Sequence, residues 1–182
     1  MNGREVLIGV TGGIAAYKTA ELVSRLVQAG AGVSVVMTRS AARLVGPKTF
    51  EALTGRPVRT RTFGLGAHPH LELARNAEVF CVAPATANLL AKAAMGLADD
   101  LLSTTLLAFA GPILLAPAMN SIMWKKPPVQ RNLAQLRADG FTIIEPEEGY
   151  LSCGMTGPGR MASPETILAA IAQALQASPK RP

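Results

Sequence analysis

Short apolar runs alternate along this chain with segments of helical periodicity. Apolar runs bounded by Gly, Pro and polar residues predict buried strands, which we place at Glu5–Val10, Gly32–Met37, Glu78–Ala83, the residues that end at Ala116, and Phe141–Ile144. The periodic segments predict helices at Ala15–Gln28, a weaker Phe50–Gly55, a segment that ends near Met95, Asp100–Phe109, Pro127–Asp139 and Pro164–Ala177. Because strands that alternate with helices are joined by right-handed crossovers, this order predicts an α/β fold with a parallel sheet and helices on both faces.

Two segments show neither the apolar runs of a buried strand nor the periodicity of a helix. Residues 56–69 predict a loop, and Glu145–Ala162 predicts a long Gly-rich loop of the kind that is usually functional. The length of 182 residues suits a single domain with a sizeable core. We therefore expect one domain over residues 1–177, followed by a disordered tail over residues 178–182.

Composition narrows the class of partner. Hydrophobic residues make up 49% of the chain and aromatic residues only 4%, so the core is expected to be aliphatic. The chain carries 18 Lys and Arg against 12 Asp and Glu, but these basic residues are scattered, and few aromatic rings are available to stack on bases. This pattern disfavours nucleic acid as a partner and favours a small anionic ligand.

The cysteines and the N-terminus indicate a compartment. Cys81 lies in an apolar run and Cys153 in a Gly-rich segment, so we expect no disulfide between them, and no signal-peptide pattern precedes the first strand. Both features favour the cytoplasm. The uncharged stretch Leu101–Met119 is about as long as a membrane span, but Pro112 and Pro117 interrupt it, so a helix and a buried strand are expected there.

The residues after the fourth strand carry the clearest candidate for ligand binding. Pro117 ends an apolar run and Asn120 follows closely, which places an amide side chain at the carboxyl edge of the predicted sheet. Ligands of open α/β sheets bind in the crevice outside this edge, and an amide both donates and accepts hydrogen bonds. The alternative is that Asn120 caps a short helix over residues 121–124.

The first turn, Thr11-Gly12-Gly13, predicts a phosphate site. Small residues between a strand and a helix N-terminus leave backbone amides free to bind an anion. The Gly spacing differs from the dinucleotide fingerprint, and Thr38-Arg39-Ser40 stands at the end of the second strand where a ribose-binding acid is expected. Hydroxyls and a guanidinium suit a phosphate monoester, which favours FMN over NAD. The alternative is that the Gly-Gly turn only links the strand to the helix and binds no ligand.

The third strand ends in a similar way, with Thr86 and Asn88 directed toward the same crevice. Thr86 is alternatively the cap of the helix that follows.

Asp99 and Asp100 precede a predicted helix, and we interpret them as charges at its N-terminus rather than as a catalytic pair. The histidines and cysteines lack the spacing of metal ligands, so no metal site is expected.

Two further residues are candidates for proton transfer. His70 follows Pro69 at the end of the predicted loop and leads into an element that ends at the crevice. An imidazole titrates near neutral pH and suits a general base, although a His in such a position is often a solvated loop residue. Cys153 lies in the long Gly-rich segment, and a thiol carried on a lid over the crevice is able to deliver a proton.

A series of motifs in a fixed order resembles one family, the homo-oligomeric flavin-containing cysteine decarboxylases. These motifs are Gly9–Lys18, His70–Leu73, Pro84–Asn88, Asp99–Ser103, Pro117–Trp124, and Cys153–Gly154 with Gly157–Met161. The resemblance covers essentially the whole chain. Two departures from the family's motifs are small: Thr86 replaces a Ser and keeps its hydroxyl, and Ser152 stands where the family often has Ala.

The resemblance implies a Rossmann-like flavoprotein with FMN as cofactor. It assigns flavin contacts to Gly12, Gly13, Ile14, Thr38, Ser40, Thr86, Ala87, Asn88, Ser103 and Ala118. It further implies that His70 is the base of the oxidative half-reaction, that Asn120 holds the substrate carboxylate, that Met123 lies near the substrate and that Cys153 donates a proton during re-reduction.

The activity that the resemblance implies is decarboxylation of phosphopantothenoylcysteine to phosphopantetheine in coenzyme A synthesis. Transient oxidation of the cysteine thiol to a thioaldehyde provides an electron sink for loss of carbon dioxide, and the resulting enethiol is then reduced. Family members assemble as trimers or as dodecamers built from trimers, with the flavin near the trimer interface, so a homo-oligomer is expected.

Other members of this structural class offer alternatives. Peptidyl-cysteine decarboxylases of lantibiotic maturation stop at the enethiol and need no reducing Cys, so Cys153 argues against that assignment. Non-catalytic flavin-binding regulatory subunits typically carry acidic or low-complexity tails, which are not seen in this sequence. A flavin prenyltransferase has a related fold but lacks the combination of His70, Asn120 and Cys153.

Overall fold

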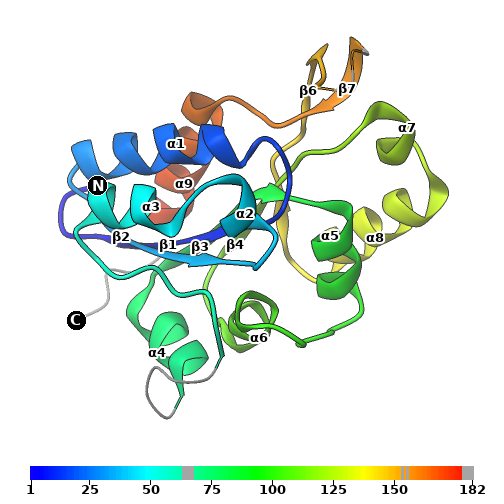
Figure 1. Cartoon of the computed structure of the whole chain (residues 1–182). Coiled ribbons are helices and arrows are strands. Elements are labelled where there is room, and N and C mark those ends of the chain that lie inside the picture. Colours follow the sequence, from blue (N-terminus) through cyan, green and yellow to red (C-terminus); the bar gives the residue numbers. More distant parts are fainter. Residues whose placement is uncertain (63–67, 153, 155, 178–182) are drawn as a thin grey trace.

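A five-stranded parallel sheet forms the centre of the computed structural model, which describes residues 1–62, 68–152, 154 and 156–177 (Figure 1). In spatial order, its strands are β2 (Gly32–Met37), β1 (Glu5–Val10), β3 (Val79–Ala85), β4 (Ile113–Pro117) and β5 (Thr142–Ile143). Every neighbouring pair in this sheet is parallel. The predicted α/β fold is confirmed.

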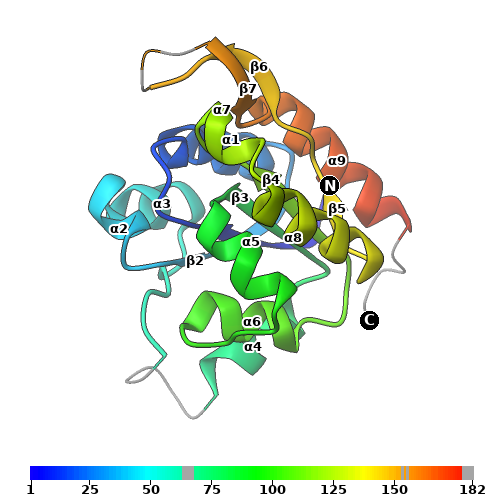
Figure 2. The same cartoon turned by 90° about the vertical axis from the view of Figure 1, so that its right-hand side faces the viewer.

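Helices cover both faces of the sheet (Figure 2). One face packs against α1 (Ala16–Gln28), α3 (Pro47–Thr54) and α9 (Pro164–Ala177), and the other against α4 (Pro69–Asn76), α5 (Ala87–Ala94), α6 (Leu101–Ala108) and α8 (Pro127–Ala138). Two single-turn helices, α2 (Ala41–Leu44) and α7 (Ser121–Trp124), follow β2 and β4. The two cores contain mainly Leu, Ile, Val and Ala, and both lie against the same rigid sheet.

The stretch predicted as a helix and a buried strand, Leu101–Met119, contains α6 and β4. Asp100 begins α6 by capping it, and Gly111-Pro112 separates the helix from the strand. Among the described residues, none of the helices combines the length and the apolar character that crossing a membrane requires.

Sequence periodicity missed a helix that begins at the last residue of the first predicted loop and a pair of strands within the second. Residues 69–76 form α4, which begins with Pro69 in its first turn, where a fixed backbone φ favours the helix. His70 is therefore a helical residue and not the end of a loop. Within the Gly-rich segment, β6 (Glu147–Tyr150) and β7 (Thr156–Arg160) form an antiparallel pair.

Gly159 explains why β7 lacks the usual strand signature. Its backbone passes so close to the residues that follow β4 that an added Cβ would lie 2.2 Å from the carbonyl oxygen of Met119. The Met119 amide donates a hydrogen bond of 2.9 Å to the Gly159 carbonyl. Glycine is needed for this approach, and the contact fixes the β6–β7 pair beside Asn120.

Candidate active site

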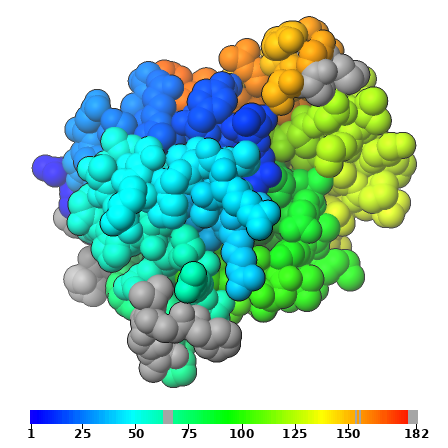
Figure 3. Space-filling view, viewed as in Figure 1, coloured from blue at the N-terminus to red at the C-terminus, as the bar shows by residue number. Residues whose placement is uncertain are grey.

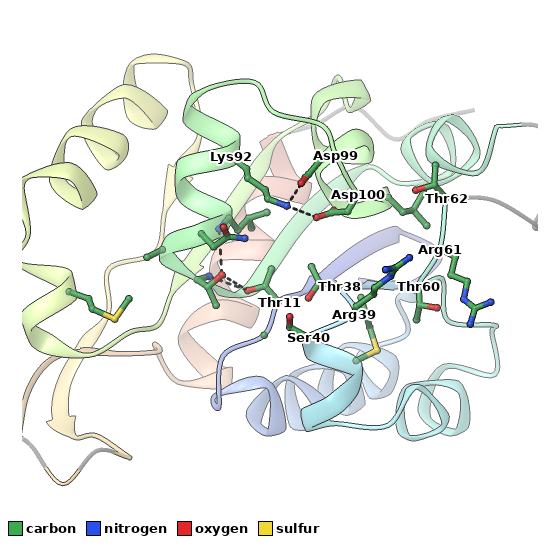
Figure 4. A pocket seen from close by; sticks show the side chains of 18 residues that line it. Thr11, Thr38, Arg39, Ser40, Thr60, Arg61, Thr62, Lys92, Asp99 and Asp100 are labelled. Atoms are coloured by element: carbon green, nitrogen blue, oxygen red, sulfur yellow. Dashed lines mark hydrogen bonds and ion pairs between the residues drawn. The ribbon is translucent and has the colours of Figure 1, made fainter.

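Two adjoining hollows lie at the carboxyl edge of the sheet. The larger has a volume of about 880 Å³ and the smaller about 510 Å³, and Gly12, Thr86, Ala87 and Met123 border both. The turns after β1, β2 and β3 surround the larger hollow (Figure 4), whereas the turn after β4 and the β6–β7 pair line the smaller one. The crevice predicted from the strand ends is therefore present, in two parts.

Nine of the ten predicted flavin contacts line these hollows. The larger is bordered by Gly12, Thr38, Ser40, Thr86, Ala87 and Asn88, and the smaller by Gly12, Gly13, Ile14, Thr86, Ala87 and Ala118. Residues from four separate turns thus converge on one region of the surface.

Ser103 is the exception among the predicted flavin contacts. Its side chain is buried on α6, and its hydroxyl completes a capping box with Asp100: the Asp100 amide donates to Ser103 Oγ at 3.1 Å, and the Ser103 amide donates to Asp100 Oδ1 at 2.9 Å. Among the described residues, Ser103 borders a separate hollow of about 340 Å³ rather than the two above. In this structure its role is to hold the start of α6.

The turns after β1 and β3 are tied together by Thr11. Its hydroxyl donates a hydrogen bond of 2.6 Å to the Pro84 carbonyl and accepts one of 3.1 Å from the Thr86 amide. Thr86 is also the N-cap of α5, because its hydroxyl accepts a hydrogen bond from the Leu89 amide. The capping alternative for Thr86 is therefore correct, and it coexists with a position on both hollows.

The entry to α1 has the features of a phosphate site. An added Cβ at Gly12 would lie 2.3 Å from Ser40 Cβ, so only glycine lets this turn approach the end of β2. In the described part of the chain, α1 has no side-chain cap, and the amides of Ile14 and Ala15 donate no hydrogen bond. Free amides at a helix N-terminus attract anions, and the Thr38 and Ser40 hydroxyls lie on the adjoining wall.

A charged cluster forms the opposite wall of the larger hollow (Figure 4). Lys92 Nζ pairs with Asp99 at 2.5 Å and with Asp100 at 2.9 Å. Burial acts to raise the pKa of Asp100, but the hydrogen bonds from the Ser103 amide and Lys92 outweigh it and hold the pKa below its ordinary value. Both aspartates lie at the start of α6, as predicted, and the single Lys92 cation offsets only part of their charge.

Asn120 is the N-cap of α7, as one of its two alternatives predicted, and it also lies at a hollow. Its side-chain oxygen accepts a hydrogen bond of 2.7 Å from the Ile122 amide and so caps α7. The residue also borders the smaller hollow, together with Ala118 and Met123. The cap holds the Asn120 oxygen on the first turn of α7, so the side chain is fixed at the border of the smaller hollow.

The two predicted proton-transfer residues are placed differently. His70 is half-buried on α4, and its Nδ1 atom is buried with no hydrogen-bond partner among the described residues. His70 borders neither of the two hollows in its own chain, as far as the described residues extend. Cys153 lies outside the described residues; Leu151 and Ser152, which precede it, border the smaller hollow.

Sequence reasoning missed several residues of the site. Thr60, Arg61 and Thr62 border the larger hollow because residues 59–62 follow an isolated bridge between Val36 and Arg59, which the loop composition did not indicate. The smaller hollow is bordered by two cations, Lys18 and Arg160. Their positions depend on α1 and β7 meeting at one edge, so no local pattern signals them.

Comparison with known proteins identifies the class. The sequence profile of the family described as Flavoprotein matches residues 1–176. The chain belongs to the flavoprotein family.

Among curated relatives of this flavoprotein, the coenzyme A biosynthesis bifunctional protein CoaBC of Bacillus subtilis is 51% identical over 171 residues, which cover 92% of this chain and 42% of the relative. CoaBC of Mycobacterium tuberculosis is 48% identical over 165 residues, covering 90% of this chain and 40% of the relative. The flavoprotein thus spans less than half the length of these relatives.

Solved structures share the fold over nearly the whole flavoprotein. A cysteine-to-serine mutant of PPC decarboxylase, complexed with pantothenoylaminoethenethiol, is 30% identical with a TM-score of 0.86, and the match covers 95% of this chain and 98% of that one. The FMN-dependent cysteine decarboxylase SpaF is 40% identical with a TM-score of 0.83, again covering 95% and 98%. The resemblance to flavin-containing cysteine decarboxylases that the sequence motifs indicated is confirmed.

Proposed function

We propose that this flavoprotein catalyses the FMN-dependent decarboxylation of phosphopantothenoylcysteine to phosphopantetheine. The observation that carries the proposal is the pair of joined hollows at the carboxyl edge of the sheet, with an uncapped α1 N-terminus on one side and Asn120 on the other. The kinship with CoaBC proteins and with PPC decarboxylase supports the same assignment. The reaction belongs to coenzyme A synthesis, and we propose that the protein acts in the cytoplasm.

The residues at the two hollows fit FMN. The free amides of Ile14 and Ala15 and the hydroxyls of Thr38 and Ser40 would hold the phosphate, and Thr86 and Ala87, which border both hollows, would contact the rest of the cofactor. When bound, FMN supplies a two-electron oxidation of the substrate thiol carbon and returns the two electrons after loss of carbon dioxide.

Three residues of the chain would act on the substrate. The Asn120 amide donates a hydrogen bond to the substrate carboxylate and holds it until it leaves as carbon dioxide. His70 accepts the proton released when the thiol carbon is oxidised. Cys153 donates the proton that completes reduction of the enethiol, which distinguishes this reaction from one that ends at the enethiol.

His70 would reach the substrate from a second copy of the chain. It borders neither hollow in its own chain, yet its buried Nδ1 lacks a partner within the described residues. A closed cyclic assembly brings such a residue of one copy to the hollow of the next. The resemblance to the flavin-containing cysteine decarboxylases implies a trimer or a dodecamer of trimers, and we propose that such an assembly is the active form.

Cofactor content tests the proposal first. The purified protein should be yellow and release FMN, not FAD or NAD, on denaturation. Gly12→Ala should weaken FMN binding, because its Cβ collides with Ser40. Gly46→Ala is the control, because an added Cβ there meets nothing within 4 Å and Gly46 borders neither hollow among the described residues. A colourless protein that takes up no FMN on reconstitution would overturn the cofactor assignment.

Substrate turnover tests the reaction. Under anaerobic conditions, phosphopantothenoylcysteine should yield carbon dioxide and phosphopantetheine. A peptide that ends in cysteine should be a poor substrate, because the peptide lacks the phosphate and the pantothenoyl chain. Faster turnover of the peptide would assign the protein to the peptidyl-cysteine decarboxylases instead.

A further inference from the structure

Two cations, Lys18 and Arg160, border the smaller hollow. Lys18 lies in the first turn of α1, and Arg160 is the last residue of β7. The space-filling view shows β6 and β7 (orange) beside the start of α1 (blue) and the α7 region (yellow-green) (Figure 3). Within the part of the chain that the structure describes, neither cation has a carboxylate within 4.0 Å.

The two acidic residues that act on Lys18, Glu147 and Glu21, each have another partner. Glu147 accepts a hydrogen bond of 2.8 Å from the Ser163 amide, and Glu21 pairs with Arg25. Burial lowers the pKa of Lys18, and the nearby Arg160 guanidinium lowers it further, against weaker opposing effects of Glu147 and Glu21. The two cations therefore repel each other across a shared hollow, which an anion between them would relieve.

The position of Arg160 is built into the β6–β7 pair. Its Nη1 atom lies 3.0 Å from the point where Gly149 would carry a Cβ, so the guanidinium crosses the neighbouring strand at a glycine. The pair itself is fixed to Met119 through Gly159. Arg160 is thus held next to the substrate-binding Asn120 by backbone contacts.

We propose that Lys18 and Arg160 together bind the phosphate ester of the substrate and select phosphorylated over unphosphorylated molecules. This inference rests on the proposed function. Two cations match a phosphate dianion, and charge-assisted hydrogen bonds from both sides are stronger than neutral ones. The substrate carboxylate is assigned to Asn120, and the FMN phosphate has its own donors at Thr38, Ser40 and the start of α1.

The test compares two substrates that differ only in the phosphate, phosphopantothenoylcysteine and pantothenoylcysteine. Lys18→Met and Arg160→Met should each lower kcat/KM for the phosphorylated substrate by roughly 10–100-fold, the usual size of a lost hydrogen bond to a charged group. Turnover of the unphosphorylated substrate and the affinity for FMN should stay unchanged. Arg131→Met, which removes an exposed charge from α8, is the matched control.

Other results would overturn the assignment. An equal loss on both substrates would mean that the cations hold the carboxylate, and weakened FMN binding would mean that they hold the cofactor's phosphate. A calorimetric comparison of phosphopantetheine with pantetheine decides the question even if the protein turns over neither substrate. Wild type should bind the phosphorylated compound more tightly, and both variants should lose that difference; no preference in wild type would refute the proposal.

Discussion

The hydroxyl of Thr11 accepts a hydrogen bond from the backbone amide of Thr86, at 3.1 Å, across two turns that lie far apart in the sequence. The same hydroxyl donates to the Pro84 carbonyl at 2.6 Å. Because Thr11 is only 1% exposed, these bonds are shielded from water. They fix the spacing between the turns after β1 and β3, and those turns carry Gly12 and Thr86, two residues shared by both hollows.

Replacing Thr11 with Val should therefore affect both stability and cofactor binding. The change keeps the shape but leaves the Thr86 amide and the Pro84 carbonyl without their partner, which costs about 1–3 kcal/mol. Urea unfolding of the FMN-free protein measures the loss of stability, and fluorescence titration measures weaker FMN binding.

Thr19→Val is the matched control for this prediction. Thr19 is equally buried and donates to the Ala83 carbonyl at 2.7 Å, but it borders neither hollow among the described residues. Its replacement should reduce stability and leave FMN affinity unchanged. If both variants bind FMN equally well, the Thr11 link has only a structural role.

The sequence predicted the strands more completely than the site. Buried parallel strands such as Ile113–Pro117 are continuous apolar runs, and each strand end brings its polar residues to the same edge, so Thr38, Thr86 and Asn120 were found from spacing alone. Motif resemblance placed Ser103 on the flavin, whereas in the structure its hydroxyl serves the capping box of α6.

What the sequence did not show depends on long-range contacts. β7 contains Gly157, Pro158 and Gly159, which hide a strand from any periodicity argument, and the Gly159 approach to Met119 is visible only once the chain is folded. Lys18 and Arg160 meet for the same reason. That His70 borders neither hollow among the described residues could not be predicted either, because its position depends on where α4 packs in the folded chain.

His70→Asn should leave FMN bound but slow carbon dioxide release by about 10²–10⁴-fold, the usual contribution of a positioned general base. His68→Asn is the control, since His68 is exposed at the start of α4 and T-shaped against His70 without bordering either hollow among the described residues. Carbon dioxide release and bound flavin are measured on the same preparations. Near-normal turnover by His70→Asn would show that His70 takes no part in the reaction.

Mixing two inactive variants tests whether the site is shared between copies. His70→Asn and Asn120→Ala should each be nearly inactive alone. If His70 of one copy serves the hollow that holds Asn120 of another, unfolding and refolding the variants together should restore part of the activity. A mixture that stays as inactive as its components would mean that each chain carries a complete site.

Cys81 should be inert in the folded protein. It lies fully buried in β3, and burial raises the pKa of its thiol to about 12. In the Cys153→Ser variant, Cys81 is the remaining cysteine. A chromogenic thiol reagent should therefore not react with this variant at pH 8 until the protein is unfolded. The raised pKa also means that stability falls as pH rises above the ordinary thiol range, because only the unfolded state then ionises. Rapid labelling of the folded variant would contradict the buried position.

Cys153→Ser separates the two halves of the proposed reaction. If the thiol acts only as the proton donor for reduction, the variant should still oxidise and decarboxylate the substrate, because His70 and Asn120 are unchanged. The product should then be the enethiol, two hydrogens lighter than phosphopantetheine by mass spectrometry, with the flavin left reduced until oxygen is admitted. Ser152→Ala, a change beside it on the same segment, should give the normal product and serves as the control. Phosphopantetheine formed by Cys153→Ser at the wild-type rate would show that the thiol has no part in reduction, and the proton would then have to come from another group at the smaller hollow.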